Sequence, residues 1–375
     1  MANIKKLKEN TVKLVKLEDV CYNGSSSLSQ KDIIMLEGKY PVYGASGLIK
    51  YINFYKYDKE YIAIVKDGAG IGRTMILPAN SSVISTLQYI FPKENINIRY
   101  LYYALNAMDL SKYYSGVTIP HIYFKDYKKE ELYLPIIDEQ INIVNKLDKI
   151  REIIDIRKKQ IEELDEIIKS QFVEMFGEIS NSKYQTVKLS SIADVGSSHR
   201  VFTNEFVENG IPFYRGTEIG MLANGEKTKD CYYISKEHYS KICDDSTKPK
   251  VGDLLLPSIC NKGQVWMVDT TEPFYYKDGR VLSISPKKGK INNKYFHQFM
   301  KYKTEREYSK LGSGSTFAEF KIFILKEFDV ILPPIELQNQ FAEIVKQIDK
   351  QKFEIQKSLE EMQKLQESLM NKYFG

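Results

Sequence analysis

The sequence is poor in the residues that build stapled domains, metal sites and membrane spans. Its 375 residues include 4 cysteines, 4 histidines and 1 tryptophan, and no apolar run reaches the ~18 residues that a membrane helix needs. So few and scattered cysteines exclude a disulfide framework and are typical of a reducing cytoplasm, where we expect the protein to act. No apolar stretch follows the first residues, so a secretion signal is not expected either.

Patterns of metal binding and catalysis are scarce as well. Three of the cysteines lack the CxxC spacing of a zinc site, one histidine stands alone, and the other three have no evident acid or nucleophile partner. These residues are Cys231, Cys243, Cys260, His238, His121, His199 and His297. The stretch Leu332-Pro-Pro-Ile335 lacks both the Asn and the aromatic residue of the Asn/Asp-Pro-Pro-aromatic motif of amino-methyltransferases. Nothing therefore predicts an enzyme, a bound metal or a cofactor in this chain.

Residues 67–74 resemble a phosphate loop in their glycine content. A P-loop needs a lysine that reaches the phosphates, and this segment offers Arg73 instead. It also lies between two predicted strands rather than at the start of a helix. We therefore expect a tight turn, at which Lys66 and Arg73 could contact a DNA backbone.

The charge is unevenly distributed along the chain. The formal net charge is +5, from 54 basic and 49 acidic residues. Residues 138–177 and 333–375 together hold 13 basic and 17 acidic residues, so the remainder of the chain carries +9. This excess favours a polyanionic partner for the remainder of the chain.

A repeat at the scale of whole domains organises the sequence. Val15-Lys-Leu-Glu-Asp-Val20 matches Val187-Lys-Leu-Ser-Ser-Ile192 at an offset of 172 residues. Three later pairs share an offset of 198. They are Ser115-Gly-Val-Thr118 with Ser313-Gly-Ser-Thr316, Leu134-Pro-Ile-Ile-Asp-Glu-Gln140 with Leu332-Pro-Pro-Ile-Glu-Leu-Gln338, and Phe176-Gly177 with Phe374-Gly375. Ordered matches at constant offsets indicate a duplication whose second globular part is 26 residues longer.

The duplication divides the chain into four segments, which are two globular units at 1–133 and 178–331 and two long helices at 134–177 and 332–375. Apolar residues recur every seven positions in both helices, the pattern of a coiled-coil seam. The seam residues are Leu147, Ile154, Ile161 and Ile168 in the first helix, and Phe341, Ile348, Ile355, Met362 and Leu369 in the second. Ile344 and Leu365 lie beside the second row. About 38 residues at ~1.5 Å rise predict a rod of roughly 57 Å.

A helix of this length cannot bury its apolar stripe alone. Pairing between the two copies in one chain, antiparallel through a pseudo-two-fold axis, is the interpretation we favour. Two unrelated surface helices, or pairing with another chain, are the alternatives. The globular units show short apolar runs such as 61–65, 74–77 and 87–91, and helical patterns at 99–109 and 294–308, so the predicted class is α+β.

This layout resembles the specificity subunit of Type I restriction-modification systems. The resemblance covers nearly the whole chain and depends on the order and duplication of four motifs. They are Gly38-Lys-Tyr-Pro-Val-Tyr-Gly-Ala-Ser-Gly47, Lys66-Asp-Gly-Ala-Gly-Ile-Gly72, Leu134-Pro-Ile-Ile-Asp-Glu-Gln140 and Leu332-Pro-Pro-Ile-Glu-Leu-Gln-Asn-Gln-Phe341. Ile136 departs from the family, which usually has a second proline there.

The resemblance implies two target recognition domains that each read a short half-site in double-stranded DNA. It implies a helix pair that fixes the spacer between the half-sites and docks two methyltransferase subunits. Those partners would bind S-adenosylmethionine, flip an adenine out of the duplex and methylate it, and motor-nuclease subunits can join the complex. Because the two domains differ in sequence and length, we expect an asymmetric bipartite target.

We expect polar and cationic loop residues to contact the DNA, although any single tyrosine in this aromatic-rich chain is more often a core residue. The candidates in the first domain are Tyr43, Ser46, Lys66, Arg73 and Thr118. The candidates in the second domain are Ser198, Arg200, Arg215, Asn261, Lys262, Arg280 and Thr316. Two other readings remain open, a DNA methyltransferase or nuclease with degenerate motifs and a coiled-coil scaffold without a DNA role.

Overall fold

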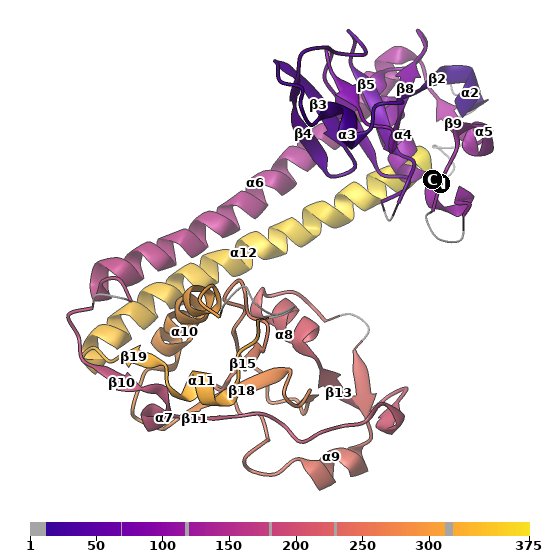
Figure 1. The fold of residues 1–375 in the computed structure, drawn as a ribbon. Helices are drawn as coiled ribbons and strands as arrows, with labels where there is room; N and C mark the ends of the chain where they lie inside the picture. The colour runs from indigo at the N-terminus through magenta and orange to yellow at the C-terminus, as the bar shows by residue number, and fades with distance from the viewer. Residues whose placement is uncertain (1–12, 69, 117–119, 180–181, 229–230, 312–317) are drawn as a thin grey trace. The chain divides into compact units, whose positions relative to one another are not determined.

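The computed structural model describes residues 13–68, 70–116, 120–179, 182–228, 231–311 and 318–375 (Figure 1). The chain forms two compact units. Unit 1 comprises Met1–Gln160 and Ile355–Gly375, and unit 2 comprises Ile161–Glu354. Both contain helices and small sheets, so the predicted α+β class is confirmed. Each unit takes in half of each long helix, whereas the sequence was divided at the helix ends; that four-segment division stays a prediction.

The described residues of unit 1 form three sheets, with strand orders β1-β9, β2-β8-β5-β6 and β4-β3-β7. Its strands are β1 Lys13–Lys16, β2 Cys21–Ser25, β3 Tyr40–Gly44, β4 Gly47–Ile52, β5 Tyr61–Val65, β6 Thr74–Leu77, β7 Ser82–Val83, β8 Leu87–Pro92 and β9 Glu131–Leu134. Its helices are α2 Leu17–Val20, α3 Gln30–Ile33, α4 Ile98–Ala107, η1 Leu110–Tyr113 and α5 Phe124–Tyr127, and the long helix α6 Ile137–Phe176 begins here.

The part of unit 2 that the structure describes also forms three sheets, with strand orders β10-β19, β11-β18-β15-β16 and β12-β14-β13-β17. Its strands are β10 Thr186–Lys188, β11 Ala193–Gly196, β12 Phe206–Val207, β13 Ile211–Tyr214, β14 Tyr232–Ile234, β15 Leu254–Pro257, β16 Trp266–Met267, β17 Tyr275–Tyr276, β18 Val281–Pro286 and β19 Asp329–Ile331. Its helices are α7 Leu189–Ile192, η2 Thr203–Glu205, α8 Gly216–Ala223, α9 Lys236–Ile242, α10 Asn293–Tyr308 and α11 Ile322–Lys326, and the long helix α12 Ile335–Phe374 begins here.

The two units share one topological plan. The four-stranded sheet β2-β8-β5-β6 has its counterpart in β11-β18-β15-β16, and every pairing in both sheets is antiparallel. The parallel pair β3–β7 has its counterpart in β13–β17. Unit 2 is longer chiefly between β13 and β15, where the chain forms α8, β14 and α9, whereas unit 1 has β4 between the corresponding strands β3 and β5. The duplicated framework thus carries different connections.

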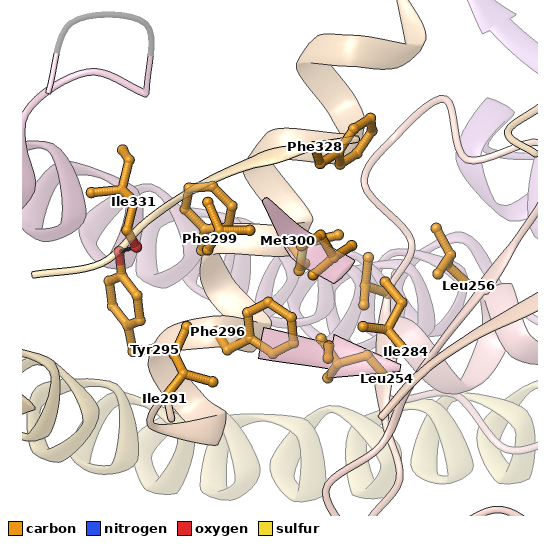
Figure 2. Close-up of a cluster of buried hydrophobic side chains, with 14 of the residues drawn as sticks. Leu254, Leu256, Ile284, Ile291, Tyr295, Phe296, Phe299, Met300, Phe328 and Ile331 are labelled. Carbon is orange, nitrogen blue, oxygen red and sulfur yellow. Dashed lines mark hydrogen bonds between the residues drawn. The ribbon is translucent and has the colours of Figure 1, made fainter. Parts of the chain in front are cut away.

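The core of unit 2 lies between α10 and the sheet containing β15 and β18. Figure 2 shows Phe296 of α10 beside Leu254 and Ile284 of these strands, with Tyr295 and Phe299 farther from them in the same buried cluster. All five side chains are at least 98% buried. In unit 1, α4 covers β5 and β8 in the same way, through buried Tyr100, Leu101 and Leu105.

A buried glutamine joins each long helix to the helix that covers its sheet. In unit 1 the Gln140 side chain accepts a hydrogen bond from the Asn97 amide at 2.8 Å and donates to the Pro135 carbonyl at 2.8 Å. Asn97 is the N-cap of α4 and accepts from the Arg99 and Tyr100 amides. Gln140 is fully buried, so these bonds satisfy polar groups that have no access to water.

Unit 2 repeats this arrangement at the matching positions. Gln338 accepts from the Asn292 amide at 2.9 Å and donates to the Pro333 carbonyl at 2.8 Å, and Asn292 caps α10. The Leu-Pro-x-Ile-x-x-Gln motif of the sequence is therefore a structural connection, in which the carbonyl of its first proline and its glutamine meet at the start of the long helix.

The long helices run in opposite directions along each other within each unit. In unit 2, Phe172 near the end of α6 packs on Phe341 near the start of α12, with ring centroids 5.6 Å apart. In unit 1, Leu147 near the start of α6 shares a core with Leu369 and Phe374 near the end of α12. The antiparallel pairing within one chain is thus confirmed, in place of unrelated helices or pairing with another chain.

The nine residues of the heptad seam are all shielded from solvent to some extent. Five are at most 8% exposed, namely Leu147, Ile154, Ile168, Phe341 and Ile348, and four are half-buried, namely Ile161, Ile355, Met362 and Leu369. The heptad pattern also placed Leu365 beside this row, yet it is 42% exposed, and Leu359 is buried instead. The strict heptad therefore misassigned Leu365. The last turns of α12, with Leu369, Met370, Tyr373 and Phe374, pack on the core of unit 1. Within the described residues, no helix is long and apolar enough to span a bilayer.

Replacing Gln140 by alanine is expected to destabilise unit 1 by about 1–3 kcal/mol, because the Asn97 amide and the Pro135 carbonyl lose their buried partner. Urea unfolding would measure the loss, and hydrogen exchange of the Asn97 amide should accelerate. Gln351→Ala, at an exposed site on α12, is the matched control and should stay within about 0.5 kcal/mol of the unmodified chain. Equal effects of the two substitutions would contradict the role given to Gln140.

Candidate nucleic-acid interface

The glycine-rich segment of unit 1 forms a tight turn between β5 and β6, as the sequence predicted. The amide of Val65 donates to the carbonyl of Arg73, and the amide of Gly72 donates back to the carbonyl of Val65, both at 2.9 Å. Gly68 and Gly72 have φ values of +93° and +83°, which glycine adopts without strain. The turn therefore presents Arg73 at its end.

Arg73 brings this turn to the neighbouring turn between β3 and β4. Its guanidinium Nη2 donates to the Ala45 carbonyl at 3.1 Å, and a Cβ at Gly70 would lie 2.4 Å from the same nitrogen. Ser46, next to Ala45, is exposed, and Tyr43 is half-buried on β3. Burial raises the pKa of Tyr43, so its hydroxyl stays a neutral donor. The fold thus brings Tyr43, Ser46 and Arg73 together.

Lys66 lies in a separate groove of about 570 Å³ beside β2 and α5. Its backbone is fixed by bonds to Thr86 and Ile122. The groove is also lined by three lysines that the sequence-based selection missed, namely Lys93, Lys125 and Lys128. The basic run at 125–129 could have indicated Lys125 and Lys128. Lys93 is distant in the sequence, and only the fold brings it to the groove.

The described residues on either side of Thr118 are joined to the glycine-rich turn. Thr118 itself lies outside the described residues. On either side of it, Ser115 and His121 exchange backbone hydrogen bonds of 2.8 Å. The imidazole Nδ1 of His121 lies 2.6 Å from a carboxylate oxygen of Asp67. The expectation that His121 has no acid partner was therefore wrong, because the partner is 54 residues away in the sequence.

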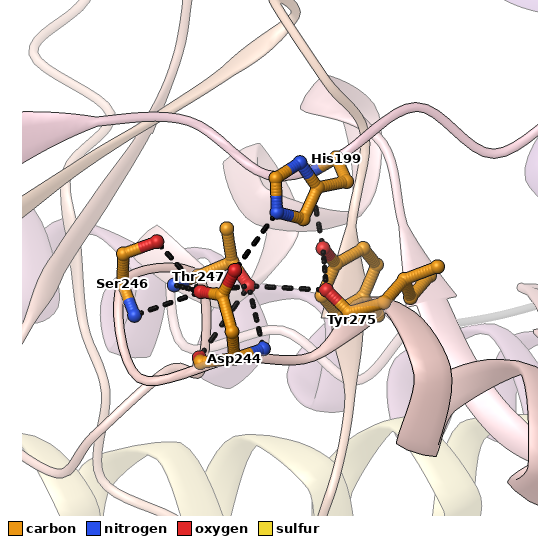
Figure 3. A network of polar contacts seen from close by, with 6 residues as sticks. His199, Asp244, Ser246, Thr247 and Tyr275 are labelled. Carbon is orange, nitrogen blue, oxygen red and sulfur yellow. Dashed lines mark hydrogen bonds and ion pairs between the residues drawn. The ribbon is translucent and has the colours of Figure 1, made fainter.

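In unit 2, the predicted residues Ser198 and Arg200 lie on a segment held by the polar network of Figure 3. The imidazole Nε2 of His199 lies 3.0 Å from a carboxylate oxygen of Asp244, and the His199 amide donates to the Tyr275 hydroxyl at 3.0 Å. His199 thus also has an acid partner that the sequence did not indicate. The Ser246 hydroxyl donates to Asp244 and not to His199, so the group is an anchor and not a nucleophilic triad.

The two residues beside His199 differ in their exposure. Ser198 is 7% exposed and its hydroxyl donates to the Tyr276 carbonyl, a bond internal to the fold. Arg200 has a side chain that is 70% exposed and 3.5 Å from Asp278. Of the two, Arg200 is the side chain that a ligand could reach directly.

A groove of about 610 Å³ in unit 2 collects two of the predicted arginines. Arg215 and Arg280 line it, together with Lys277, which the sequence-based selection missed. Its polar residues are Thr217, Asn224, Ser258 and Gln264, and its glycines are Gly216 and Gly220. Lysine and arginine beside hydroxyl and amide groups are the side chains that contact phosphates and base edges. Among the described residues of unit 2, the lining of this groove therefore suits DNA binding.

Each arginine of the groove is hydrogen-bonded to its own glutamate. Arg280 donates to Glu319 at 2.8 Å, and Glu319 also accepts from Lys321 and, at 3.3 Å, from the Ser258 hydroxyl. Hydrogen bonding to Lys321 and the charges of both cations hold the pKa of Glu319 below its usual range, so the cluster carries a net positive charge. Arg215 is bound by Glu218 on α8.

Two of the remaining candidates of unit 2 lie on the turn between β15 and β16, and the third lies outside the described residues. Asn261 and Lys262 are exposed, and the Lys262 amide donates to the Gln264 side chain at 3.0 Å. Gln264 lines the groove, so this turn borders it. Thr316 lies outside the described residues. No group of three or more His, Cys, Asp or Glu side chains in the described ranges could hold a metal ion.

The anchor of Figure 3 predicts a pH dependence. Hydrogen bonds from the Ser246 hydroxyl and from His199 hold the pKa of Asp244 well below its usual range. Because the folded-state pKa is depressed, its stabilising effect is present above the unfolded pKa of ~3.9 and is lost as the pH falls through the folded value. In protein with carboxyl-labelled aspartate, the resonance that disappears in Asp244→Asn should still report a carboxylate at pH 3. A resonance protonated at pH 4 would contradict the network.

Sequence comparison identifies the duplicated units. The family model described as the Type I restriction modification DNA specificity domain matches residues 9–166 and again 181–365. A putative type I restriction enzyme specificity subunit of Haemophilus influenzae is 24% identical over 340 residues, covering 84% of this chain and 81% of that protein. The type I restriction enzyme MjaVIII specificity subunit of Methanocaldococcus jannaschii is 26% identical over 371 residues, covering 90% and 85%.

Solved structures share the fold. The crystal structure of the S subunit of a type I restriction-modification system from M. genitalium superposes with a TM-score of 0.56 at 16% identity, covering 98% of both chains. A chain from a study of complex assembly in the type I R-M system gives 0.51 at 16% identity, covering 97% of this chain and 98% of that one. With both specificity-domain matches, the chain belongs to the family of type I restriction-modification specificity subunits, non-catalytic proteins that recognise DNA targets and direct a methyltransferase complex to them.

Proposed function

We propose that this chain recognises an asymmetric bipartite DNA target, with one half-site read by each unit. The observation that carries the proposal is a duplicated framework with unlike faces. The glutamine connection and the strand order are the same in both units, whereas the residues around the strand ends differ. Unit 2 has α8 where unit 1 has the short turn at Ser46. Different side chains at equivalent places favour different base sequences.

The proposal has a second part, which is that the long helices set the spacer between the half-sites and dock the methyltransferase subunits. Each is a continuous helix of 40 residues that contributes to the cores of both units. Such helices suit a fixed spacer between two half-sites and a docking surface for two methyltransferase subunits. In this proposal the partners bind S-adenosylmethionine and methylate a flipped adenine, and motor-nuclease subunits join where the system restricts. The four free cysteines favour a cytoplasmic location.

The target itself can be determined by methylome sequencing of cells that express this chain with its methyltransferase. An asymmetric motif with two separated specific parts is expected. A palindromic or continuous motif would overturn the bipartite proposal. Methylation by the purified chain alone, with labelled S-adenosylmethionine, would instead favour an enzyme, and an unchanged target in a complex lacking this chain would favour a scaffold.

The Arg280 cluster is expected to bind phosphate rather than a base, because two cations share one carboxylate there. Arg280→Ala should therefore weaken binding of the assembled complex to all DNA sequences by a similar factor. The slope of log K against log salt should fall by about one unit. Lys236→Ala, an exposed lysine of α9 that does not line the groove, is the matched control and should leave the slope unchanged.

Two results would count against this assignment. A loss confined to one base at one position would make Arg280 a base-reading residue. An unchanged affinity and slope would show that the groove does not face DNA.

A further inference from the structure

Arg215 is held in one orientation by three hydrogen bonds to a single carboxylate. Its Nε donates to Oε2 of Glu218 at 3.0 Å, its Nη2 donates to Oε1 at 2.6 Å, and its backbone amide donates to Oε2 at 2.8 Å. Glu218 is 2% exposed and sits in the first turn of α8, so it cannot move freely. The carboxylate therefore fixes both the backbone and the side chain of Arg215.

The bonds to Glu218 use one edge of the guanidinium and leave another available. Glu218 occupies the edge formed by Nε and Nη2. The adjacent edge, at the end of the guanidinium, consists of an Nη1 hydrogen and the second Nη2 hydrogen, which are nearly parallel and can donate together. Among the described residues no hydrogen bond of Nη1 is present. The Tyr232 ring lies 4.8 Å from the guanidinium carbon and supports its face.

The position and charge of this pair suit base contact better than phosphate contact. Arg215 lines the groove of unit 2 with a side chain that is 37% exposed, whereas Glu218 is buried and does not line it, so a ligand in the groove can reach the arginine but not the carboxylate. Hydrogen bonding from Arg215 holds the pKa of Glu218 below its usual range despite burial, and the pair is neutral overall. A neutral pair gains little from phosphate attraction, whereas its directed donors retain their value at a base edge.

The four bases differ in what they offer two parallel donors in the major groove. Guanine presents two acceptors, N7 and O6. Adenine presents one acceptor beside an amino donor, cytosine presents an amino donor, and thymine presents one acceptor beside a methyl group. Only guanine satisfies both donors of the free edge of Arg215.

We infer that Arg215, oriented by Glu218, reads one guanine through N7 and O6 in the half-site of unit 2. Arg215 is the specificity-determining residue, and Glu218 is a positioning residue that does not touch DNA. The inference rests on the proposed function, since it requires that unit 2 bind a half-site. It goes further by assigning a base, a groove of the DNA and a pair of atoms to one side chain.

The test uses the assembled complex and synthetic duplexes that carry its methylated target. Each guanine of the unit 2 half-site is replaced in turn by 7-deazaguanine, which lacks the N7 acceptor, and by hypoxanthine, which keeps N7 and O6. At one position, 7-deazaguanine should weaken binding about fivefold or more, and hypoxanthine should have little effect.

The same duplexes are then bound by two variants. Arg215→Lys keeps the positive charge but loses the paired donors, so it should bind the unmodified target more weakly and become insensitive to 7-deazaguanine at that position. Glu218→Gln keeps an acceptor for the Arg215 amide, as in a capping box, but loses the charged fork. It should lower the guanine preference at the same position only, while a residue needed merely for folding would weaken binding to every duplex alike.

The half-site of unit 1 is the internal control and should be read normally by both variants. If no guanine of the unit 2 half-site couples to Arg215, or if Arg215→Lys weakens binding to all sequences equally, the inference fails while the proposed function stands. If the unmodified complex shows no sequence-specific binding at all, the proposed function fails first.

Discussion

The structure depends on one constraint, which is that two 40-residue amphipathic helices must bury an apolar stripe along their whole length. Neither can do so within a single globular core. Each helix begins in the unit that precedes it in the chain and ends in the other, where its terminal aromatic residue is part of the core. Phe176 at the end of α6 packs on Tyr295 of unit 2, and Phe374 at the end of α12 packs on Tyr100 of unit 1. The helices are therefore components of both cores rather than linkers.

The cap of the sheet-covering helix connects this framework to the proposed DNA-binding surface. Gln140 and Gln338 fix α4 and α10 to the starts of the long helices. In turn, α4 packs on β5, and α10 shares a buried core with β15. The loops that follow these strands carry Lys66 and Arg73 in unit 1, and Asn261 and Lys262 in unit 2. Because the connection is polar, buried and directional, it sets an orientation that apolar packing alone would leave loose.

Much of the fold could be predicted because it follows from local patterns. The runs at 61–65, 74–77 and 87–91 are strands, since continuous apolar segments bounded by turn residues suit a buried sheet. The glycine-rich turn at 67–74 was predicted because the segment lies between two strands and lacks the lysine of a P-loop, and Gly68 and Gly72 there adopt positive φ values. The heptads located both long helices to within a few residues, but not the side chains at the end of α12, where Leu365 is exposed and Leu359 buried.

The candidate site was less accessible to such reasoning, because its partners are distant in the sequence. Asp67 with His121, His199 with Asp244, and Arg280 with Glu319 are separated by 54, 45 and 39 residues. Nothing in the local sequence around Ser198 indicates that its hydroxyl is used internally. Arg215 with Glu218 is the exception, since a spacing of three residues at a helix start is a local signal.

The sequence by itself determined the duplication, the two long helices, the α+β class and the family, because repeats and periodicities are properties of the chain order. Only the tertiary structure decided that the helices are shared between two cores, which side chains face the grooves and which arginine is neutralised by a buried glutamate. The physical reason is that burial, charge neutralisation and hydrogen-bond direction depend on neighbours that the folded chain brings together from distant positions.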